Sequence, residues 1–228
     1  MQRIRYLIPN SVTLLNAFSG CCAIVCLLNQ AYQNALLFIL IALIADFLDG
    51  FLARWLNATS ELGMQLDSLS DAVSFGVVPA TIVYCLLKQD TALPPYAAFA
   101  AFAAFFIAVF SIYRLAKFNI DTRQREIFVG LNTPANTLFF SGLLILNFYK
   151  GFQFSGLFLL CLIPISCFLL VSEIEMFSFK FKKFTWSGNE IRFIFIGIAL
   201  LLLFIVPYYA LPCIITIYIV INLIKKLV

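Results

Sequence analysis

Apolar runs of about 20 residues recur along the whole chain, separated by short polar segments. A helix of that length rises about 30 Å, which matches the hydrocarbon core of a bilayer. Lipid leaves backbone polar groups without water, so such runs form helices, and short alternating segments typical of barrel strands are absent from the sequence. Since 63% of the 228 residues are hydrophobic and 11% are charged, no polar stretch is long enough for a separate soluble domain. We therefore predict a single all-α membrane domain, residues 1–228.

The hydropathy pattern predicts a polytopic bundle of about eight transmembrane helices. Their expected ranges are 9–28, 33–55, 65–88, 95–118, 134–149, 155–172, 190–207 and 209–225. With the N-terminus in the cytoplasm, all but two of the 15 Lys and Arg residues face that side, the exceptions being Lys88 and Lys150. Basic residues accumulate in cytoplasmic loops. The bias thus predicts cytoplasmic N- and C-termini and an integral protein of the cell (inner or cytoplasmic) membrane.

The remaining composition excludes several kinds of chemistry. No histidine is present, which rules out histidine acid–base catalysis and histidine metal ligands. The seven cysteines lie scattered in apolar runs without metal-ligand spacing, so we expect them to behave as small hydrophobic residues. The net charge of +4 is explained by loops beside membrane spans, and no nucleic-acid partner is expected.

Acidic residues gather in one short region of the chain. Five of the eleven acidic residues fall between positions 46 and 71. A carboxylate at mid-membrane costs about 2.5–3.5 kcal/mol, so several of them need compensation. One helix face carries residues at the spacing i, i+3, i+4 and i+7, and the next helix carries an i, i+4 pair. These residues are Asp46, Asp49, Gly50 and Ala53 on the first helix, and Asp67 and Asp71 on the second.

A short connection makes the two helices antiparallel neighbours, so the four carboxylates converge. Like charges at that distance require cations among them. Hard divalent cations favour oxygen ligands, and Mg²⁺ or Mn²⁺ links carboxylates to substrate phosphates. Gly50, Ala53 and Gly63 leave room for a bulky ligand, and Arg54 offers a cationic fork suited to phosphate. The region therefore predicts a metal site for a diphosphate-bearing substrate at the cytoplasmic ends of the two helices.

Written out, the segment is Asp46-x2-Asp49-Gly50-x2-Ala53-Arg54-x8-Gly63-x3-Asp67-x3-Asp71. It resembles the signature of the CDP-alcohol phosphotransferase family at every defined position. The resemblance implies two divalent ions, Mg²⁺ or Mn²⁺, bridged by Asp46 and Asp67, with Asp49 completing one site and Asp71 the other. Asp71 would also be the base that deprotonates the attacking hydroxyl. The implied CDP-lipid site comprises Asp49, Gly50, Ala53, Arg54, Gly63 and Asp67.

Outside the signature, four segments resemble the phosphatidylserine synthase branch of that family. They are Ile8–Asn16, Leu66–Pro79, Tyr113–Asn119 and Phe128–Ala135, with Lys117 where arginine is usual and Asn132 where proline is usual. The branch implies a homodimer that transfers the phosphatidyl group of CDP-diacylglycerol to L-serine, giving phosphatidylserine and CMP. Because the serine carboxylate needs a cation, Arg114 and Lys117 are candidate acceptor residues, with Asn119 as a polar neighbour. Both cations can equally be topology anchors.

Other functions remain open from the sequence. The same chemistry could serve another acceptor alcohol, such as glycerol 3-phosphate or inositol phosphate, which would call for more basic residues. The aspartates could instead form the ion site of a cation transporter. A transporter of that kind would be expected to have discontinuous helices in two related halves, and the sequence shows neither feature. A purely structural membrane protein leaves the cost of the buried acids unexplained.

Overall fold

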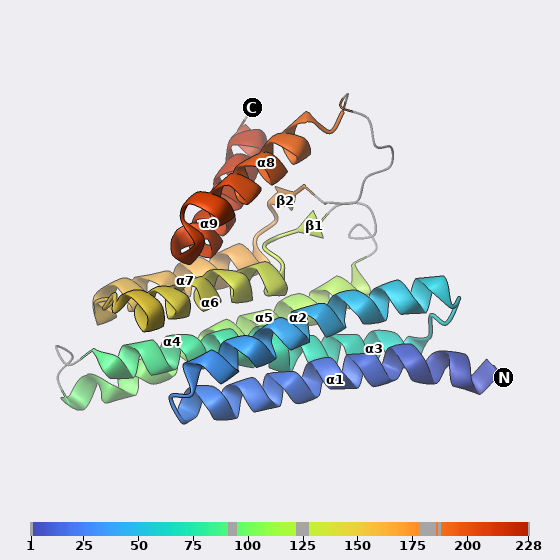
Figure 1. The fold of residues 1–228 in the computed structure, drawn as a ribbon, viewed down its shortest axis with the longest axis horizontal. Coiled ribbons are helices and arrows are strands. Elements are labelled where there is room, and N and C mark those ends of the chain that lie inside the picture. Colours follow the sequence, from blue (N-terminus) through green and yellow to red (C-terminus); the bar gives the residue numbers. More distant parts are fainter. Residues whose placement is uncertain (1, 91–94, 122–127, 178–185, 187, 228) are drawn as a thin grey trace.

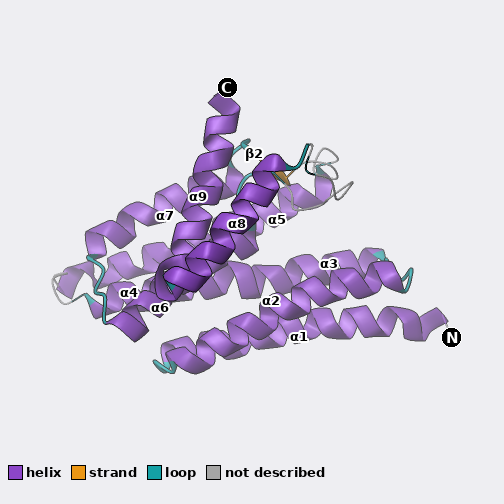
Figure 2. Cartoon of the chain, turned by 45° about the horizontal axis from the view of Figure 1, so that its top comes forward, coloured by secondary structure: helices purple, strands orange, loops and turns teal. Residues whose placement is uncertain are grey.

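The computed structural model describes residues 2–90, 95–121, 128–177, 186 and 188–227. Nearly all of the described chain is helical, as Figure 2 shows. The helices are α1 (Gln2–Leu28), α2 (Tyr32–Trp55), α3 (Glu61–Asp71), the π-helix η1 (Ala72–Val77), α4 (Val78–Gln89), the 3₁₀-helix η2 (Pro95–Phe105), α5 (Phe106–Ile120), α6 (Thr133–Lys150), α7 (Gly156–Val171), α8 (Glu190–Ile205) and α9 (Pro207–Leu227). The strands are β1 (Phe128–Val129) and β2 (Glu175–Met176).

The predicted all-α membrane bundle is confirmed. Within the described residues, five helical stretches are long and apolar enough to cross a membrane. They are Arg5–Leu28, Tyr32–Trp55, Glu61–Gln89, Phe99–Ile120 and Pro207–Lys225. The other three predicted spans coincide with α6, α7 and α8, which are helical but do not belong to this group of five. The number of crossings and the extent of a single domain over 1–228 stay predictions.

The helices form a layered arrangement in Figure 1. Helices α1 to α5 lie roughly alongside one another, α6 and α7 lie next to them, and α8 and α9 cross at a steep angle. The corner expected around Pro207 is present, because α8 ends at Ile205 and α9 begins at Pro207. Helix α9 packs closely on α6, where a Cβ added at Gly142 would lie 3.0 Å from the Pro212 nitrogen.

A tight connection joins α2 to α3 and brings their acidic ends together. Asn57 adopts the left-handed conformation, with φ of 49°, which short polar residues tolerate better than branched ones. Ser60 then caps α3, its Oγ accepting a hydrogen bond from the Gly63 backbone N–H at 3.0 Å. The chain thereby reverses direction within a few residues, and α3 returns antiparallel to α2.

The long helix that follows changes its winding directly after Asp71. In η1 the backbone N–H of Val78 bonds to the carbonyl of Val73, five residues earlier. Such π-helical turns are rare and are frequently found at functional sites. Pro79 has no N–H to offer the carbonyl of Phe75, four residues earlier. The Thr137 hydroxyl from α6 donates to that carbonyl at 3.3 Å, so the Phe75 carbonyl finds its hydrogen-bond partner on a neighbouring helix.

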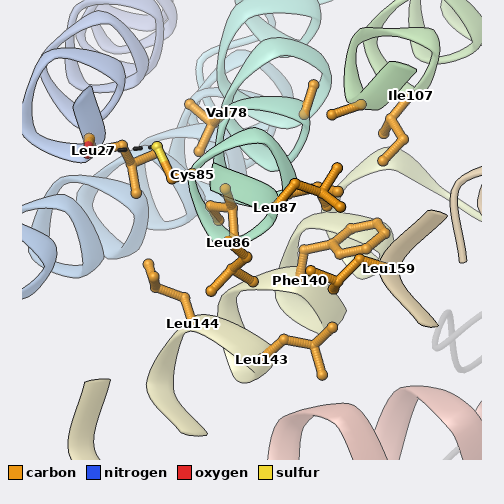
Figure 3. Packing of buried hydrophobic residues seen from close by; sticks show 14 of the residues in the cluster. Leu27, Val78, Cys85, Leu86, Leu87, Ile107, Phe140, Leu143, Leu144 and Leu159 are labelled. Carbon is orange, nitrogen blue, oxygen red and sulfur yellow. Dashed lines mark hydrogen bonds between the residues drawn. The ribbon is translucent and has the colours of Figure 1, made fainter. Parts of the chain in front are cut away.

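The stretch that carries Asp67 and Asp71 runs through the centre of the bundle. In the most apolar part of Glu61–Gln89, 72% of the residues are buried, against 22–39% in the other four long stretches. Figure 3 shows α4 enclosed by side chains of α6, α7 and α5. Cys85 Sγ donates to the Leu27 carbonyl of α1 at 3.6 Å. Burial therefore fixes α4, and the aspartates of α3 extend from this fixed part of the same long helix.

A small antiparallel pairing that the sequence did not predict joins the segment before α6 to the segment after α7. Phe128 lies opposite Met176, and Val129 opposite Glu175. Helix α9 holds Phe177, the residue after β2, because the Phe177 N–H donates to Asn222 Oδ1 at 2.8 Å and its carbonyl accepts from the Tyr218 hydroxyl at 2.9 Å.

Candidate active site

Three of the four predicted carboxylates meet between α2 and α3. One oxygen from each of Asp46, Asp49 and Asp67 lies within 4.8 Å of the other two. Asp46 and Asp49 share a face of α2 one turn apart, and the short connection places Asp67 of α3 opposite them. Asp49 is 6% exposed, and its Oδ2 has no hydrogen-bond partner among the described residues. Three of the four carboxylates that were expected to converge therefore do so.

Asp71 lies one helical turn beyond Asp67 and outside this group of three. Its buried carboxylate interacts electrostatically with Asp46 and Asp67, and also with the Arg114 guanidinium of α5. Asp71 Oδ1 accepts a hydrogen bond from Asn16 Nδ2 of α1 at 3.2 Å. The fourth aspartate therefore interacts both with the carboxylate cluster and with a buried arginine.

A cavity of about 450 Å³ opens beside the cluster. Its wall includes all six residues predicted for the CDP-lipid site. Those residues are Asp49, Gly50, Ala53, Arg54, Gly63 and Asp67. The first turns of α1 also contribute, through Pro9, Asn10 and Thr13. A Cβ at Gly63 would lie 3.2 Å from Asn10 Oδ1 and from Ser60 Oγ, so a side chain there would intrude on a narrow part of the wall.

The three candidate acceptor residues separate into different environments. Arg114 is 7% exposed and faces Asp71, and its Nε has no hydrogen-bond partner among the described residues. Lys117 instead forms an ion pair with Glu173 at 3.2 Å. Asn119 donates to the hydroxyl of Ser68 at 2.8 Å. Of the three, Arg114 is the one that the structure brings against the carboxylates.

Sequence reasoning missed the contribution of α1. Asn16 touches Asp71, and Thr13 lies beside Asp49. The signal available was the segment Ile8–Asn16, which resembles the first helix of the branch but carries no charged residue to attract attention. Asn132 departs from the branch pattern, and its role is local: its Oδ1 caps α6 by accepting from the Ala135 N–H at 2.8 Å.

The described carboxylates fit a divalent cation. Three buried or half-buried carboxylates this close repel one another in the absence of positive charge. The unpartnered Asp49 Oδ2 supplies a free oxygen ligand. Oxygen-rich sets of this kind suit Mg²⁺ or Mn²⁺ better than softer metals. Arg54 interacts with Asp49 from the cavity wall, so a cation and an anionic ligand can be accommodated side by side.

Comparison with known proteins gives consistent results. The family model described as CDP-alcohol phosphatidyltransferase matches residues 6–176. The CDP-diacylglycerol–serine O-phosphatidyltransferase of Helicobacter pylori (strain 26695) is 32% identical over 228 residues, covering 97% of this chain and 92% of the relative. The protein of that name from Mycobacterium leprae is 36% identical over 179 residues, covering 75% of this chain and 58% of the relative. The protein of that name from Bacillus subtilis is 35% identical over 127 residues, covering 56% of this chain and 69% of the relative.

The fold and the site together define a polytopic helical membrane protein with a carboxylate cluster beside a cavity walled by small residues. The chain belongs to the CDP-alcohol phosphatidyltransferase family. It spans about three fifths of the length of the mycobacterial relatives and nearly the whole length of the Helicobacter relatives.

Proposed function

We propose that the chain transfers the phosphatidyl group of CDP-diacylglycerol to the hydroxyl of L-serine, forming phosphatidylserine and releasing CMP. The observation that carries the proposal is the cavity, whose wall holds six of the eight signature residues with the carboxylate cluster at one side. The names of the relatives, which span up to 97% of this chain, support the same reaction. A volume of about 450 Å³ falls within the range of small-molecule sites, about 300–1,000 Å³.

The cavity residues would bind the CDP moiety. The wall carries no bulky side chain at Gly50, Ala53 and Gly63, so the nucleotide can approach the helix backbone there. Arg54 lies at the same wall and would pair with the nucleotide phosphates through its planar fork. The diacylglycerol tail would remain in the bilayer, alongside the apolar outer face of α2, where Phe47 and Phe51 are exposed.

The reaction would be an in-line displacement at the lipid-side phosphorus. The serine hydroxyl oxygen forms the new bond to phosphorus, the bond to the CMP oxygen breaks, and Asp71 takes the hydroxyl proton. Asp71 suits this task because its carboxylate interacts both with the cluster and with Arg114. Asp46, Asp49 and Asp67, with Asp71, would hold Mg²⁺ or Mn²⁺, two ions by family resemblance. Such ions neutralise the diphosphate and stabilise the leaving oxygen.

Arg114 would bind the carboxylate of the acceptor. Its guanidinium is buried next to Asp71, and a buried guanidinium with an unpartnered N–H is suited to a small anionic group. Among the described residues, Arg114 is the cation that interacts with Asp71. An acceptor with one carboxylate needs less positive charge than a phosphate-bearing one, which supports serine over glycerol 3-phosphate or inositol phosphate.

The site would face the cytoplasm. Lys88 and Lys150, the two basic residues predicted on the outer side, lie in the last turns of α4 and α6. That end of the bundle also holds the start of α2, because Tyr32 accepts a hydrogen bond from Gln89 at 2.7 Å. The aspartates lie toward the opposite end of α2. This separation supports a cytoplasmic site in the cell membrane, and the homodimer implied by the resemblance stays a prediction.

The proposal is tested by measuring CMP release from purified protein given CDP-diacylglycerol and Mg²⁺ or Mn²⁺, with and without L-serine. We expect serine-dependent CMP release with an equal amount of phosphatidylserine. Release with glycerol 3-phosphate or inositol phosphate, but not with serine, would keep the chemistry and replace the acceptor. Metal-dependent cation uptake into vesicles without CMP release from any acceptor would favour a transporter.

A graded series at Gly50 tests the nucleotide cavity. A Cβ at this position would lie 3.6 Å from Arg54 Nη1, an ordinary contact, so Gly50→Ala should change the KM for CDP-diacylglycerol by no more than about twofold. Gly50→Leu would fill the cavity and displace Arg54, and we expect the KM to rise about tenfold or more. Gly197→Leu is the matched control, because a Cβ at Gly197 meets nothing within 4 Å. Equal KM values for the two Gly50 variants would place the nucleotide elsewhere.

Arg114 and Lys117 give a paired test of the acceptor pocket. Arg114→Gln removes the cation proposed to bind the serine carboxylate, and we expect the KM for serine to rise about ten- to a hundredfold, because hydrogen bonds to charged groups contribute about 1.5–3 kcal/mol. Lys117→Gln should leave the KM for serine within about threefold of the wild-type value, since Lys117 pairs with Glu173. Steady-state kinetics at saturating CDP-diacylglycerol measure both. The reverse ranking would assign the carboxylate to Lys117.

A further inference from the structure

Asn16 is the polar residue of α1 that contacts Asp71. Its side chain is fully buried, and its Nδ2 donates to Asp71 Oδ1 at 3.2 Å. A carboxylate oxygen can only accept, so the contact also fixes which end of the Asn16 amide faces Asp71. With one oxygen held, the Asp71 carboxylate can no longer rotate freely, and its second oxygen keeps a constant direction relative to the cluster and Arg114.

The other end of the same amide contributes nothing to stability. Asn16 Oδ1 is buried and has no hydrogen-bond partner among the described residues. A buried acceptor left unpaired costs free energy. A leucine would remove that cost, but it would also leave Asp71 Oδ1 without the Asn16 donor, so the two effects on stability oppose each other. The presence of an asparagine at position 16 is better explained by the hydrogen bond that its Nδ2 donates to Asp71.

The backbone around Asn16 is fixed against the helix that carries Asp71. The Ser74 hydroxyl donates to the Asn16 carbonyl at 2.9 Å, three residues after Asp71 and on the same side of that helix. One turn further along α1, a Cβ at Gly20 would lie 2.9 Å from Ser74 Cα, so the two backbones touch. This contact sets the distance between α1 and η1, and with it the reach of Asn16 to Asp71.

We propose that Asn16 is a positioning residue for the base: it holds one oxygen of Asp71 so that the other is presented to the acceptor hydroxyl. The inference rests on the proposed function, because it takes Asp71 as the base. It adds a residue from the first helix, outside the signature, to the machinery of the reaction. A positioning role predicts a loss in kcat that is separate from substrate binding and from stability.

The test is Asn16→Leu in the full-length protein, with kcat, the KM for CDP-diacylglycerol and the melting temperature in detergent measured together. We expect kcat to fall about ten- to a hundredfold, since small misplacements of a reacting group carry losses of that size. The KM should stay within about twofold, and the melting temperature should fall no further than in the Asn136→Leu control described next. The assay uses whichever acceptor alcohol supports CMP release by the wild type, so failure of serine would count against the proposed function alone.

Asn136→Leu is the matched control. Asn136 is also a buried asparagine with one end paired, its Oδ1 accepting from Ser166 at 2.8 Å, and with Nδ2 unpartnered among the described residues. Its kcat should remain near that of the wild type. An Asn16→Leu kcat within about twofold of the wild type, or an equal loss in the control, would overturn the proposal. Should Asn16→Leu fail to fold, Asn16→Ser, too short to reach Asp71, should show the same loss of kcat.

Discussion

Replacing Asp71 by asparagine should reduce CMP release by about a hundred- to ten-thousandfold, the contribution typical of general bases. The amide keeps the size of the carboxyl group and can still contact Asn16, but it cannot take a proton. The variant should therefore fold, extract from the membrane and melt like the wild type. Steady-state CMP release at saturating substrates, together with a melting curve in detergent, measures both effects.

Asp90→Asn is the matched control for this prediction. Asp90 caps the far end of the same long helix, where its carboxylate accepts a hydrogen bond from the Gly156 N–H. An asparagine there keeps an acceptor for that N–H, and its turnover should equal that of the wild type. Normal turnover in Asp71→Asn would remove Asp71 from the role of base, whatever the behaviour of the control.

Removing divalent metal should abolish turnover. The carboxylates of Asp46, Asp49 and Asp67 lie within 4.8 Å of one another, and without a cation they would repel both each other and the substrate diphosphate. We expect a chelator to reduce CMP release by about a thousandfold or more, with recovery on adding Mg²⁺ or Mn²⁺. Binding of Mn²⁺ itself, followed by electron paramagnetic resonance, gives a readout that does not depend on activity.

The matched variants for the metal test are Asp49→Asn and Glu61→Gln. Asp49 belongs to the cluster, so its variant should bind Mn²⁺ more weakly and need more metal for half-maximal activity. Glu61 lines the same cavity but lies outside the cluster, so its variant should need about as much metal as the wild type. Turnover that survives exhaustive chelation would contradict the proposed role of the carboxylates.

The parts of this molecule that follow from local pattern could be predicted from the sequence. Hydropathy located the helices, because a span must be long and apolar. The i, i+3, i+4 and i+7 spacing placed Asp46, Asp49, Gly50 and Ala53 on one face, and the short connection placed Asp67 opposite them. These features depend on residues within one helix or one turn, where geometry is nearly fixed.

The features that depend on contacts between distant segments could not be predicted. Asn16 lies 55 residues from Asp71, and no spacing rule relates positions on α1 to positions on α3. The pairing of β1 with β2 rests on two-residue strands, too short for an alternating pattern. The different environments of Arg114 and Lys117 depend on how α5 faces its neighbours, since both residues belong to one basic segment in the sequence.

The π-helical turn after Asp71 has a consequence for how this helix tolerates length changes. A π-turn contains one residue more than an α-turn, and one residue corresponds to about 100° of rotation. The polar face that carries Asp67 and Asp71 and the enclosed apolar surface of α4 are therefore out of phase with a single continuous α-helix. Deleting one residue between 72 and 77 would therefore restore a regular α-helix and leave the aspartates facing α2, whereas deleting one residue from the α-helical part of α4 would turn the aspartates by about 100° relative to the rest of α4. In this segment the extra residue is absorbed by the π-turn, which keeps the two halves of the helix aligned with their separate surroundings.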